Sequence, residues 1–109
     1  MIETNLIKLD TLRKLEAAIE ESRFRPVLLF KHSTNCGISS GVFRDVSTMN
    51  ADINLVIVQT ERHISNEIER RTGIKHESPQ AIVLKDGEAV YHASHYDITV
   101  EDINEHLSN

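Results

Sequence analysis

Two short, unbroken apolar runs constrain the fold of this chain more than any other feature. They are Pro-Val-Leu-Leu-Phe at residues 26–30 and Asn-Leu-Val-Ile-Val-Gln at residues 54–59, and neither alternates with polar residues. Runs of this kind are typical of strands that are buried on both faces, as in the centre of a parallel sheet. The sequence therefore predicts a layered α/β domain in which helices cover both faces of a sheet.

Apolar residues at helical spacing accompany both runs. One helix is predicted over about residues 11–22, and a second follows the polar stretch 32–35, which offers several helix caps. A third contains Ile64 and Ile68 and ends at Gly73, because glycine is the usual residue just past a helix end. The order so far is helix, strand, helix, strand, helix.

The last third of the chain predicts a hairpin and a terminal helix. Strands over residues 81–84 and 89–91 flank Lys-Asp-Gly-Glu at 85–88, and Asp-Gly is a strong signal for a two-residue hairpin turn. Thr99 and Asp102 have the spacing of a capping box, which marks the start of a helix.

These elements predict a thioredoxin-like α/β fold. A parallel centre and the C-terminal hairpin form a mixed sheet of four or five strands, with helices on both faces. Residues 5–9 are the candidate for the fifth strand, at an edge of the sheet. With 109 residues and 39% apolar content, the chain suits one domain over residues 1–109.

Composition narrows the classes of function. The chain has 12 Lys and Arg against 17 Asp and Glu, a formal net charge of −5, and the charges are scattered. No basic surface is therefore expected for nucleic acid or for a membrane. No stretch reaches the roughly 18 to 20 apolar residues of a membrane span, and residues 1–10 lack the pattern of a signal peptide. We expect a cytoplasmic protein.

Cysteine and histidine usage argues against a disulfide or a metal centre. One cysteine, Cys36, excludes an internal disulfide and fits a reducing compartment. His92 and His95 are the closest histidine pair, but a spacing of three on a strand does not bring both rings to one side. No metal site is expected. The other histidines outside the Cys36 region are interpreted as polar surface residues: His63, His76 and His106.

Cys36 is the residue best placed for chemistry. It lies where a predicted strand turns into a predicted helix, and a helix N-terminus favours the negatively charged thiolate, which is the reactive form. Gly37 leaves the sulfur open to approach, and Ser39 is placed to donate a hydrogen bond to it. The alternative is that a lone cysteine is an inert, buried apolar residue. The polar residues before Cys36 favour an accessible thiol instead.

Pro79 is a second feature of interest, because Ser78-Pro79-Gln80 directly precedes a predicted strand. A proline in this place is usually a rigid trans turn. A cis bond would leave the preceding backbone free to pair with an extended thiol ligand. From composition alone, trans is the expected form.

Three segments carry a resemblance to a known family: Phe-Lys-His-Ser-Thr-Asn-Cys-Gly-Ile-Ser at 30–39, Lys-His-Glu-Ser-Pro-Gln-Ala at 75–81 and Lys-Asp-Gly-Glu at 85–88. Together they resemble the YtxJ family of the bacillithiol system, also called monothiol bacilliredoxins, over nearly the whole chain. In that family a thioredoxin fold carries a T-C-P-I-S type motif, whose cysteine attacks mixed disulfides between bacillithiol and protein cysteines. Here Asn35 and Gly37 replace the usual threonine and proline, while Cys36 and Ser39 remain.

The resemblance implies further site residues. It implies that Pro79 is cis and that Ser78 and Pro79 lie beside the substrate. It also implies that Lys31 and His32 lead into the active-site loop, where either is able to help hold a thiolate by charge. The alternative for both is a solvated loop residue.

The expected function is monothiol disulfide exchange by the Cys36 thiolate, which releases a client protein from its mixed disulfide. Ser39 stands where a dithiol oxidoreductase has its resolving cysteine, so recycling is intermolecular. The resemblance implies bacillithiol as co-substrate, S-thiolated client proteins and a recycling reductase or redoxin as partners, and no permanently bound cofactor. We expect a monomer or a weak dimer.

Two rival functions remain open. The Cys-Gly-Ile-Ser segment is one residue from the C-G-F-S motif of monothiol glutaredoxins, which can hold a [2Fe-2S] cluster between two subunits. Those proteins normally carry Gly-Gly before an Asp near the last helix, where this chain has Ser-His-Tyr-Asp at 94–97. The other rival is a non-catalytic interaction domain that keeps the thioredoxin-like fold.

Overall fold

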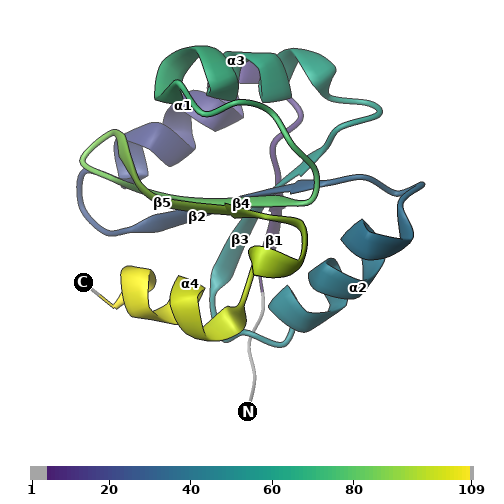
Figure 1. The fold of residues 1–109 in the computed structure, drawn as a ribbon. Helices are drawn as coiled ribbons and strands as arrows, with labels where there is room; N and C mark the ends of the chain where they lie inside the picture. Colours follow the sequence, from purple (N-terminus) through teal and green to yellow (C-terminus); the bar gives the residue numbers. More distant parts are fainter. Residues whose placement is uncertain (1–4, 109) are drawn as a thin grey trace.

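A five-stranded mixed sheet forms the centre of the molecule (Figure 1), in a computed structural model that describes residues 5–108. The strand order is β1-β3-β2-β4-β5. β1, β3 and β2 run parallel, and β4 and β5 are antiparallel additions. The strands are β1 (Asn5–Lys8), β2 (Val27–His32), β3 (Asp52–Ile57), β4 (Gln80–Lys85) and β5 (Glu88–Ser94).

Helices cover both faces of this sheet, as Figure 1 shows. α1 (Leu12–Glu21) and α3 (Arg62–Thr72) lie on one face, and α2 (Gly37–Val46) and α4 (Val100–Leu107) lie on the other. A short 3₁₀ turn, η1 (His95–Asp97), connects β5 to α4. The thioredoxin-like fold predicted from the sequence is therefore confirmed, with five strands rather than four.

Each face of the sheet has its own hydrophobic core. Phe30, with no exposed surface, belongs to the core under α2 and α4, and Leu29, its neighbour, belongs to the core under α1 and α3. Successive residues of a strand point to opposite faces, so an unbroken apolar strand fills both cores at once. This requirement explains the two apolar runs in the sequence.

Most of the predicted turns and helix ends lie where the sequence indicated them. Gly73 ends α3 in the left-handed conformation at φ 74°, and Asp86 and Gly87 form the two-residue turn at φ 54° and 79°. The Thr99 hydroxyl accepts a hydrogen bond from the amide of Asp102 at 3.2 Å. The predicted caps of α2 are wrong, since Cys36 itself is the N-cap rather than a residue of the stretch 32–35.

The boundaries of the two apolar strands differ from the prediction by up to two residues, and β5 extends three residues beyond its predicted end. β2 continues past Phe30 to His32, because Lys31 and His32 both find buried hydrogen-bond partners despite their polarity. β3 begins at Asp52, which pairs with the edge strand β1, and ends at Ile57. The predicted edge strand over residues 5–9 is confirmed as β1. Within the described part of the chain, no helix is long and apolar enough to cross a membrane.

Candidate active site

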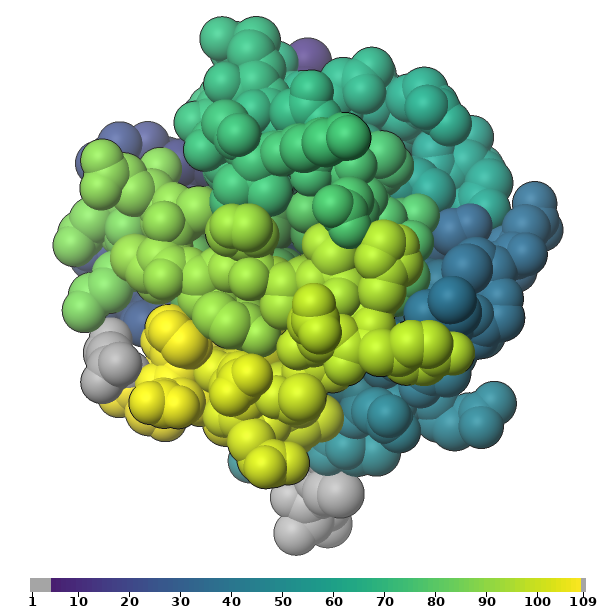
Figure 2. Space-filling model, viewed as in Figure 1, coloured from purple at the N-terminus to yellow at the C-terminus, as the bar shows by residue number. Residues whose placement is uncertain are grey.

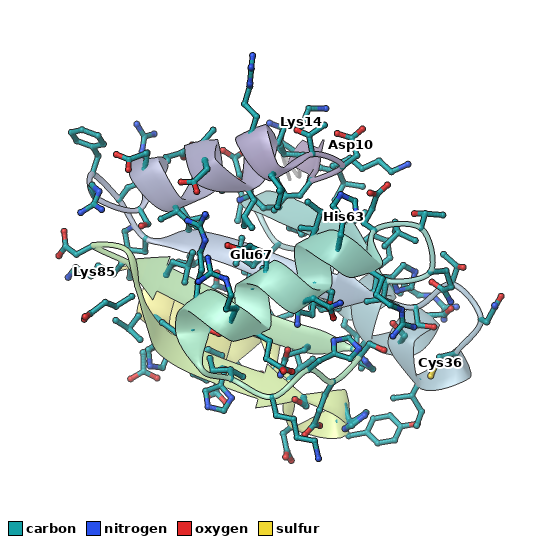
Figure 3. The ribbon with its side chains drawn as sticks, turned by 90° about the horizontal axis from the view of Figure 1, so that it is seen from above. Asp10, Lys14, Cys36, His63, Glu67 and Lys85 are labelled. Atoms are coloured by element: carbon teal, nitrogen blue, oxygen red, sulfur yellow. The ribbon has the colours of Figure 1, made fainter. Side chains whose placement is uncertain are left out.

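Cys36 is the N-cap of α2 and lies at the end of the loop that follows β2. Cys36 is partly exposed and its side chain caps no backbone amide, so the sulfur remains available to a substrate. Figure 3 shows Cys36 at the outer end of α2. A side chain on the exposed Gly37 would meet no other atom within 4 Å, so the approach beside the thiol is open. The first turn of a helix also presents unpaired amides that stabilise a negative charge.

Ser39 lies beneath this loop and has no exposed surface. Its hydroxyl accepts a hydrogen bond from the amide of Ser33 at 2.9 Å and lies 2.7 Å from Nδ1 of His32. The ring of His32 stacks on Phe43, with the ring centroids 4.6 Å apart. Burial lowers the pKa of His32, which keeps its ring neutral at pH 7.

The tautomer of His32 decides what the Ser39 hydroxyl can do. If Nδ1 accepts, Ser39 donates its proton to His32 and has none left for a thiolate. If Nδ1 carries the proton, Ser39 accepts from both neighbours and its own proton is free for a further acceptor. The contacts of His32 are thus with Ser39 and Phe43, and its neutral ring brings no charge to the Cys36 loop.

A residue that follows β3 holds the same loop from outside. The amide nitrogen of the Gln59 side chain donates to the Ser33 hydroxyl at 2.8 Å, and its oxygen accepts from the Thr34 amide at 3.2 Å. Sequence reasoning missed Gln59. The only signal for it was its position directly after a parallel strand, at the sheet edge where active-site loops gather.

Strand register brings Pro79 to this edge as well. β4 pairs with β2 so that Gln80 lies opposite Lys31, which places Pro79 opposite His32. On its other side, the Pro79 carbonyl accepts a hydrogen bond from the amide of His95 at 3.0 Å. The Ser78-Pro79 bond is cis, as the family resemblance implied. His32, Pro79 and His95 therefore form a row across the ends of three neighbouring strands, and Ser78 directly precedes Pro79.

Lys31 lies on the opposite face of the sheet from His32. Its ammonium is fully buried and donates to the Ser65 carbonyl at 3.3 Å and to Nδ1 of His76 at 3.2 Å. The Ser65 hydroxyl also lies 2.9 Å from this nitrogen. Burial lowers the pKa of Lys31 to about 8. The contacts of Lys31 thus lie with α3 and the segment before Pro79, and not with the Cys36 loop.

His76 was interpreted from the sequence as a surface residue, and this is wrong. It is partly buried, and its own amide donates to a Glu69 carboxylate oxygen at 2.6 Å. Burial, followed by the charge of Lys31, lowers the pKa of His76. The available signal was Ser65, a polar residue three positions from Ile68 on the inward face of a helix, which needs a buried partner.

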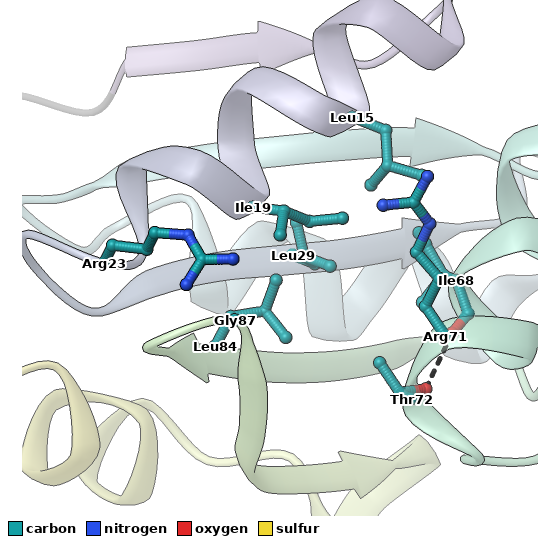
Figure 4. A pocket seen from close by; sticks show the side chains of 9 residues that line it. All are labelled: Leu15, Ile19, Arg23, Leu29, Ile68, Arg71, Thr72, Leu84 and Gly87. Carbon is teal, nitrogen blue, oxygen red and sulfur yellow. Dashed lines mark hydrogen bonds between the residues drawn. The ribbon is translucent and has the colours of Figure 1, made fainter.

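A separate apolar pocket of about 220 Å³ lies between α1, α3 and the hairpin (Figure 4). Arg23 and Arg71 flank its apolar floor. None of its lining residues belongs to the Cys36 loop or the Pro79 segment, and Arg71 is already paired with Glu16 and Glu67. This pocket is therefore not the candidate active site. Within residues 5–108, no three His, Cys, Asp or Glu residues cluster as a metal site would require.

Fold and site together define a class of protein, the thioredoxin-fold proteins with a single cysteine at the start of α2. Thioredoxins from Fasciola hepatica and Nicotiana alata share the fold, at 18% and 16% identity and TM-scores of 0.72 and 0.76. The comparisons cover 94% and 98% of this chain and 96% of each thioredoxin. At this level of identity, the likeness concerns the fold alone.

A more specific match narrows the class. Residues 7–103 match the family described as monothiol bacilliredoxin BrxC, and the chain belongs to that family. It is also 36% identical to a solved structure described provisionally as an oxidoreductase with a thioredoxin fold, with a TM-score of 0.84. That comparison covers 92% of this chain and 91% of the other. The predicted family is therefore confirmed.

Proposed function

We propose that this protein removes bacillithiol from S-thiolated client proteins by monothiol disulfide exchange, with Cys36 as the nucleophile. The observation that carries the proposal is the position of Cys36. Its sulfur is partly exposed and caps no amide at the N-terminus of α2, in a chain of the monothiol bacilliredoxin family. Such a site stabilises a thiolate and leaves it accessible. We place the reaction in the cytoplasm, where thiols are kept reduced.

The proposed reaction transfers the small thiol from the client to Cys36. The Cys36 thiolate attacks the bacillithiol sulfur of the mixed disulfide, the bond between this sulfur and the client sulfur breaks, and the client leaves as its thiolate. A second bacillithiol thiolate then attacks the same bacillithiol sulfur and releases Cys36 as a thiolate, with bacillithiol disulfide as product. In the net reaction, the client sulfur is reduced from disulfide to thiolate and the second bacillithiol is oxidised from thiolate to disulfide, while Cys36 returns to its starting thiolate form.

Ser39 and His32 have supporting roles in this proposal. Because residue 39 is serine and no second cysteine exists, Cys36 cannot close an internal disulfide and waits for an external thiol or a redoxin. The Ser39 hydroxyl, shared with His32 and the Ser33 amide, holds the loop that leads to Cys36 in place. Ser78 and Pro79 form the proposed contact with the client backbone.

The replacement Cys36→Ser tests the nucleophile. We expect exchange with a bacillithiolated client to fall by roughly 10³-fold or more, because a serine hydroxyl is not ionised at neutral pH. Intact-mass measurement of client and enzyme follows both partners of the transfer. The matched control is Ser40→Ala, which alters an exposed side chain one turn further into α2.

Two results would overturn the proposal. One is substantial turnover by the Cys36→Ser protein, and the other is a wild-type protein that forms no bacillithiol adduct on Cys36. A coloured dimer after anaerobic reconstitution with iron, sulfide and a small thiol, in the absence of exchange activity, would instead support the cluster-binding function.

A further inference from the structure

The segment that connects α3 to β4, residues 73–79, carries the cis Ser78-Pro79 bond and contains no helix or strand. Its surface is green in Figure 2 and lies between α3 and the yellow-green η1. A segment without regular hydrogen bonds is not held by its own backbone, so contacts with other elements set its path. These contacts therefore decide where Ser78 and Pro79 lie.

Two buried side chains of the sheet hold consecutive residues of this segment. Lys31 lies 3.2 Å from Nδ1 of His76, and Nε2 of Gln80 donates to the carbonyl of Lys75 at 3.0 Å. Lys31 and Gln80 are a cross-strand pair of β2 and β4, so their side chains share one face of the sheet. The segment is thus attached to the sheet from below.

The charges at this attachment decide which group donates. The pKa of Lys31, lowered by burial to about 8, leaves the amine mostly protonated at pH 7, and an ammonium can only donate. Burial, followed by the charge of Lys31, lowers the pKa of His76, so its ring is neutral. Nδ1 therefore accepts from Lys31, and the proton of the ring lies on Nε2. A bond from a charged donor is stronger than one from a neutral donor.

Helix α3 holds the same histidine from above. The Ser65 hydroxyl lies 2.9 Å from Nδ1 of His76, and a Glu69 carboxylate oxygen accepts from the His76 amide at 2.6 Å. Ring and backbone of His76 are thus both fixed, one residue before Glu77 and two before Ser78. So short a stretch of chain cannot absorb a displacement of His76, and Ser78 and Pro79 would move with it.

We propose that His76 is a positioning residue for the exchange reaction: its hydrogen bond from the Lys31 ammonium sets the place of the Ser78-Pro79 segment, and with it the backbone that the client half of the mixed disulfide contacts. The inference rests on the proposed function, which assigns the client to that segment. It gives Lys31 and His76 no action on the Cys36 sulfur. Loss of the bond should therefore slow exchange with a client but not with a small disulfide.

The test compares two disulfides that share the bacillithiol half. One is a bacillithiolated client peptide, and the other is bacillithiol disulfide, which has no peptide. Attack by Cys36 on either forms the same bacillithiol adduct, so intact-mass measurement follows both reactions in the same way. The measured quantity is the ratio of the two second-order rate constants, peptide over bacillithiol disulfide.

A matched pair of variants isolates the hydrogen bond. Leucine and asparagine have the same branched shape, and the amide oxygen of asparagine is as many bonds from Cα as Nδ1 of histidine. We expect His76→Leu to lower the ratio by about tenfold, because misplacing a reacting group by about 1 Å can cost roughly 10²-fold in rate. His76→Asn keeps an acceptor for Lys31 and should stay close to the wild-type ratio.

Two further variants separate this effect from a loss of folding and from a surface change. The double variant Lys31→Met, His76→Leu removes the buried ammonium together with its acceptor, so no unpaired charge remains, and it should show the same low ratio. His63→Leu replaces an exposed histidine of α3 and should leave the ratio unchanged. The rate of Cys36 alkylation by neutral iodoacetamide should be the same in every variant.

The outcomes distinguish the two proposals. If the wild type forms no adduct from either disulfide, the proposed exchange function fails. If adducts form and the ratio is unchanged in both His76→Leu and the double variant, exchange stands and the positioning role is overturned. The role is also overturned if His76→Asn lowers the ratio as far as His76→Leu, because the hydrogen bond would then be irrelevant, or if His63→Leu lowers it equally.

Discussion

Lys31 and His32 are neighbours on β2, yet each belongs to a different side of the molecule. His32 faces α2 and holds the Cys36 loop through Ser39. Lys31 faces α3 and binds Ser65 and His76, just before the Ser78-Pro79 segment. One strand end therefore supports the loop of the proposed nucleophile from one face of the sheet and the proposed substrate segment from the other.

The two sides differ in how they satisfy a buried polar group. The His32 ring is neutral, stacks on an aromatic ring and shares one hydrogen bond, so its burial costs little. Lys31 places an ammonium with no exposed surface next to a carbonyl and an imidazole, and Glu69 is the acid whose charge partly offsets the burial. The comparison indicates that stability on the Lys31 side depends on charge, whereas on the His32 side it depends on hydrogen-bond geometry.

The largest expected effect concerns the Lys31 side, where Lys31→Met removes the buried charge. The pKa of Lys31 falls from 10.5 in the unfolded chain to about 8 in the folded protein. Between these values the unfolded chain binds a proton that the folded protein lacks, so the free energy of unfolding rises with pH. Relative to Lys31→Met, the wild type should gain about 3 kcal/mol between pH 7 and pH 11.

Urea denaturation at a series of pH values measures this gain. Lys85→Met is the matched control, because Lys85 is an exposed residue of the same sheet and its replacement should leave the pH dependence of the wild type unchanged. A wild type and a Lys31→Met protein whose free energies of unfolding run parallel up to pH 11 would show that the buried ammonium carries no cost.

The fold was predictable from the sequence because its signals are local. An unbroken apolar run specifies a strand buried on both faces, and Asp86-Gly87 specifies a turn that few other residue pairs adopt. Strand ends were less predictable. β2 continues through Lys31 and His32 because partners from elsewhere in the chain satisfy them, and no pattern within β2 itself indicates those partners.

The candidate site likewise contains residues that the sequence predicted and contacts that it did not. Cys36, Gly37 and Ser39 belong to one short motif at a strand-to-helix junction, so the sequence pointed to them directly. The partners of Lys31 lie 34 and 45 residues away, and only the order of strands in the sheet brings them together. Once β2 is known to extend to residue 32, the alternation of side chains along the strand places the Lys31 ammonium on the face opposite to His32.

A second prediction concerns the His32 side, where the hydroxyl of Ser39 is removed. Ser39→Ala removes, at a fully buried position, the hydroxyl that accepts from the part-buried Ser33 amide and pairs with the buried ring of His32. One buried and one part-buried polar group then lack this partner, and the free energy of unfolding should fall by about 2 kcal/mol. Ser40→Ala, at the exposed neighbouring position, should change it by less than about 0.5 kcal/mol.

Urea denaturation at pH 7 compares these two serine variants. Equal stabilities for Ser39→Ala and the wild type would mean that the buried hydroxyl contributes nothing, and the loop would then depend on Gln59 alone.

The smallest expected effect sharpens the comparison at acid pH, where the His32 ring should respond and the Lys31 ammonium should not. Burial lowers the pKa of His32 below 6.5, so in acid the unfolded chain takes up a proton before the folded protein does. The free energy of unfolding should therefore fall as the pH drops below 6.5 and through the folded pKa.

His32→Phe keeps an aromatic ring against Phe43 but does not titrate, so the wild type should lose stability relative to this variant between pH 7 and pH 5. Contributions from His76, whose pKa is also lowered, are common to both proteins and cancel in the difference. Lys31 itself stays protonated in both states below pH 7 and adds nothing to this difference. Identical acid slopes for the wild type and His32→Phe would show that the ring is hydrated in the folded protein, and the contrast between the two faces of β2 would then be lost.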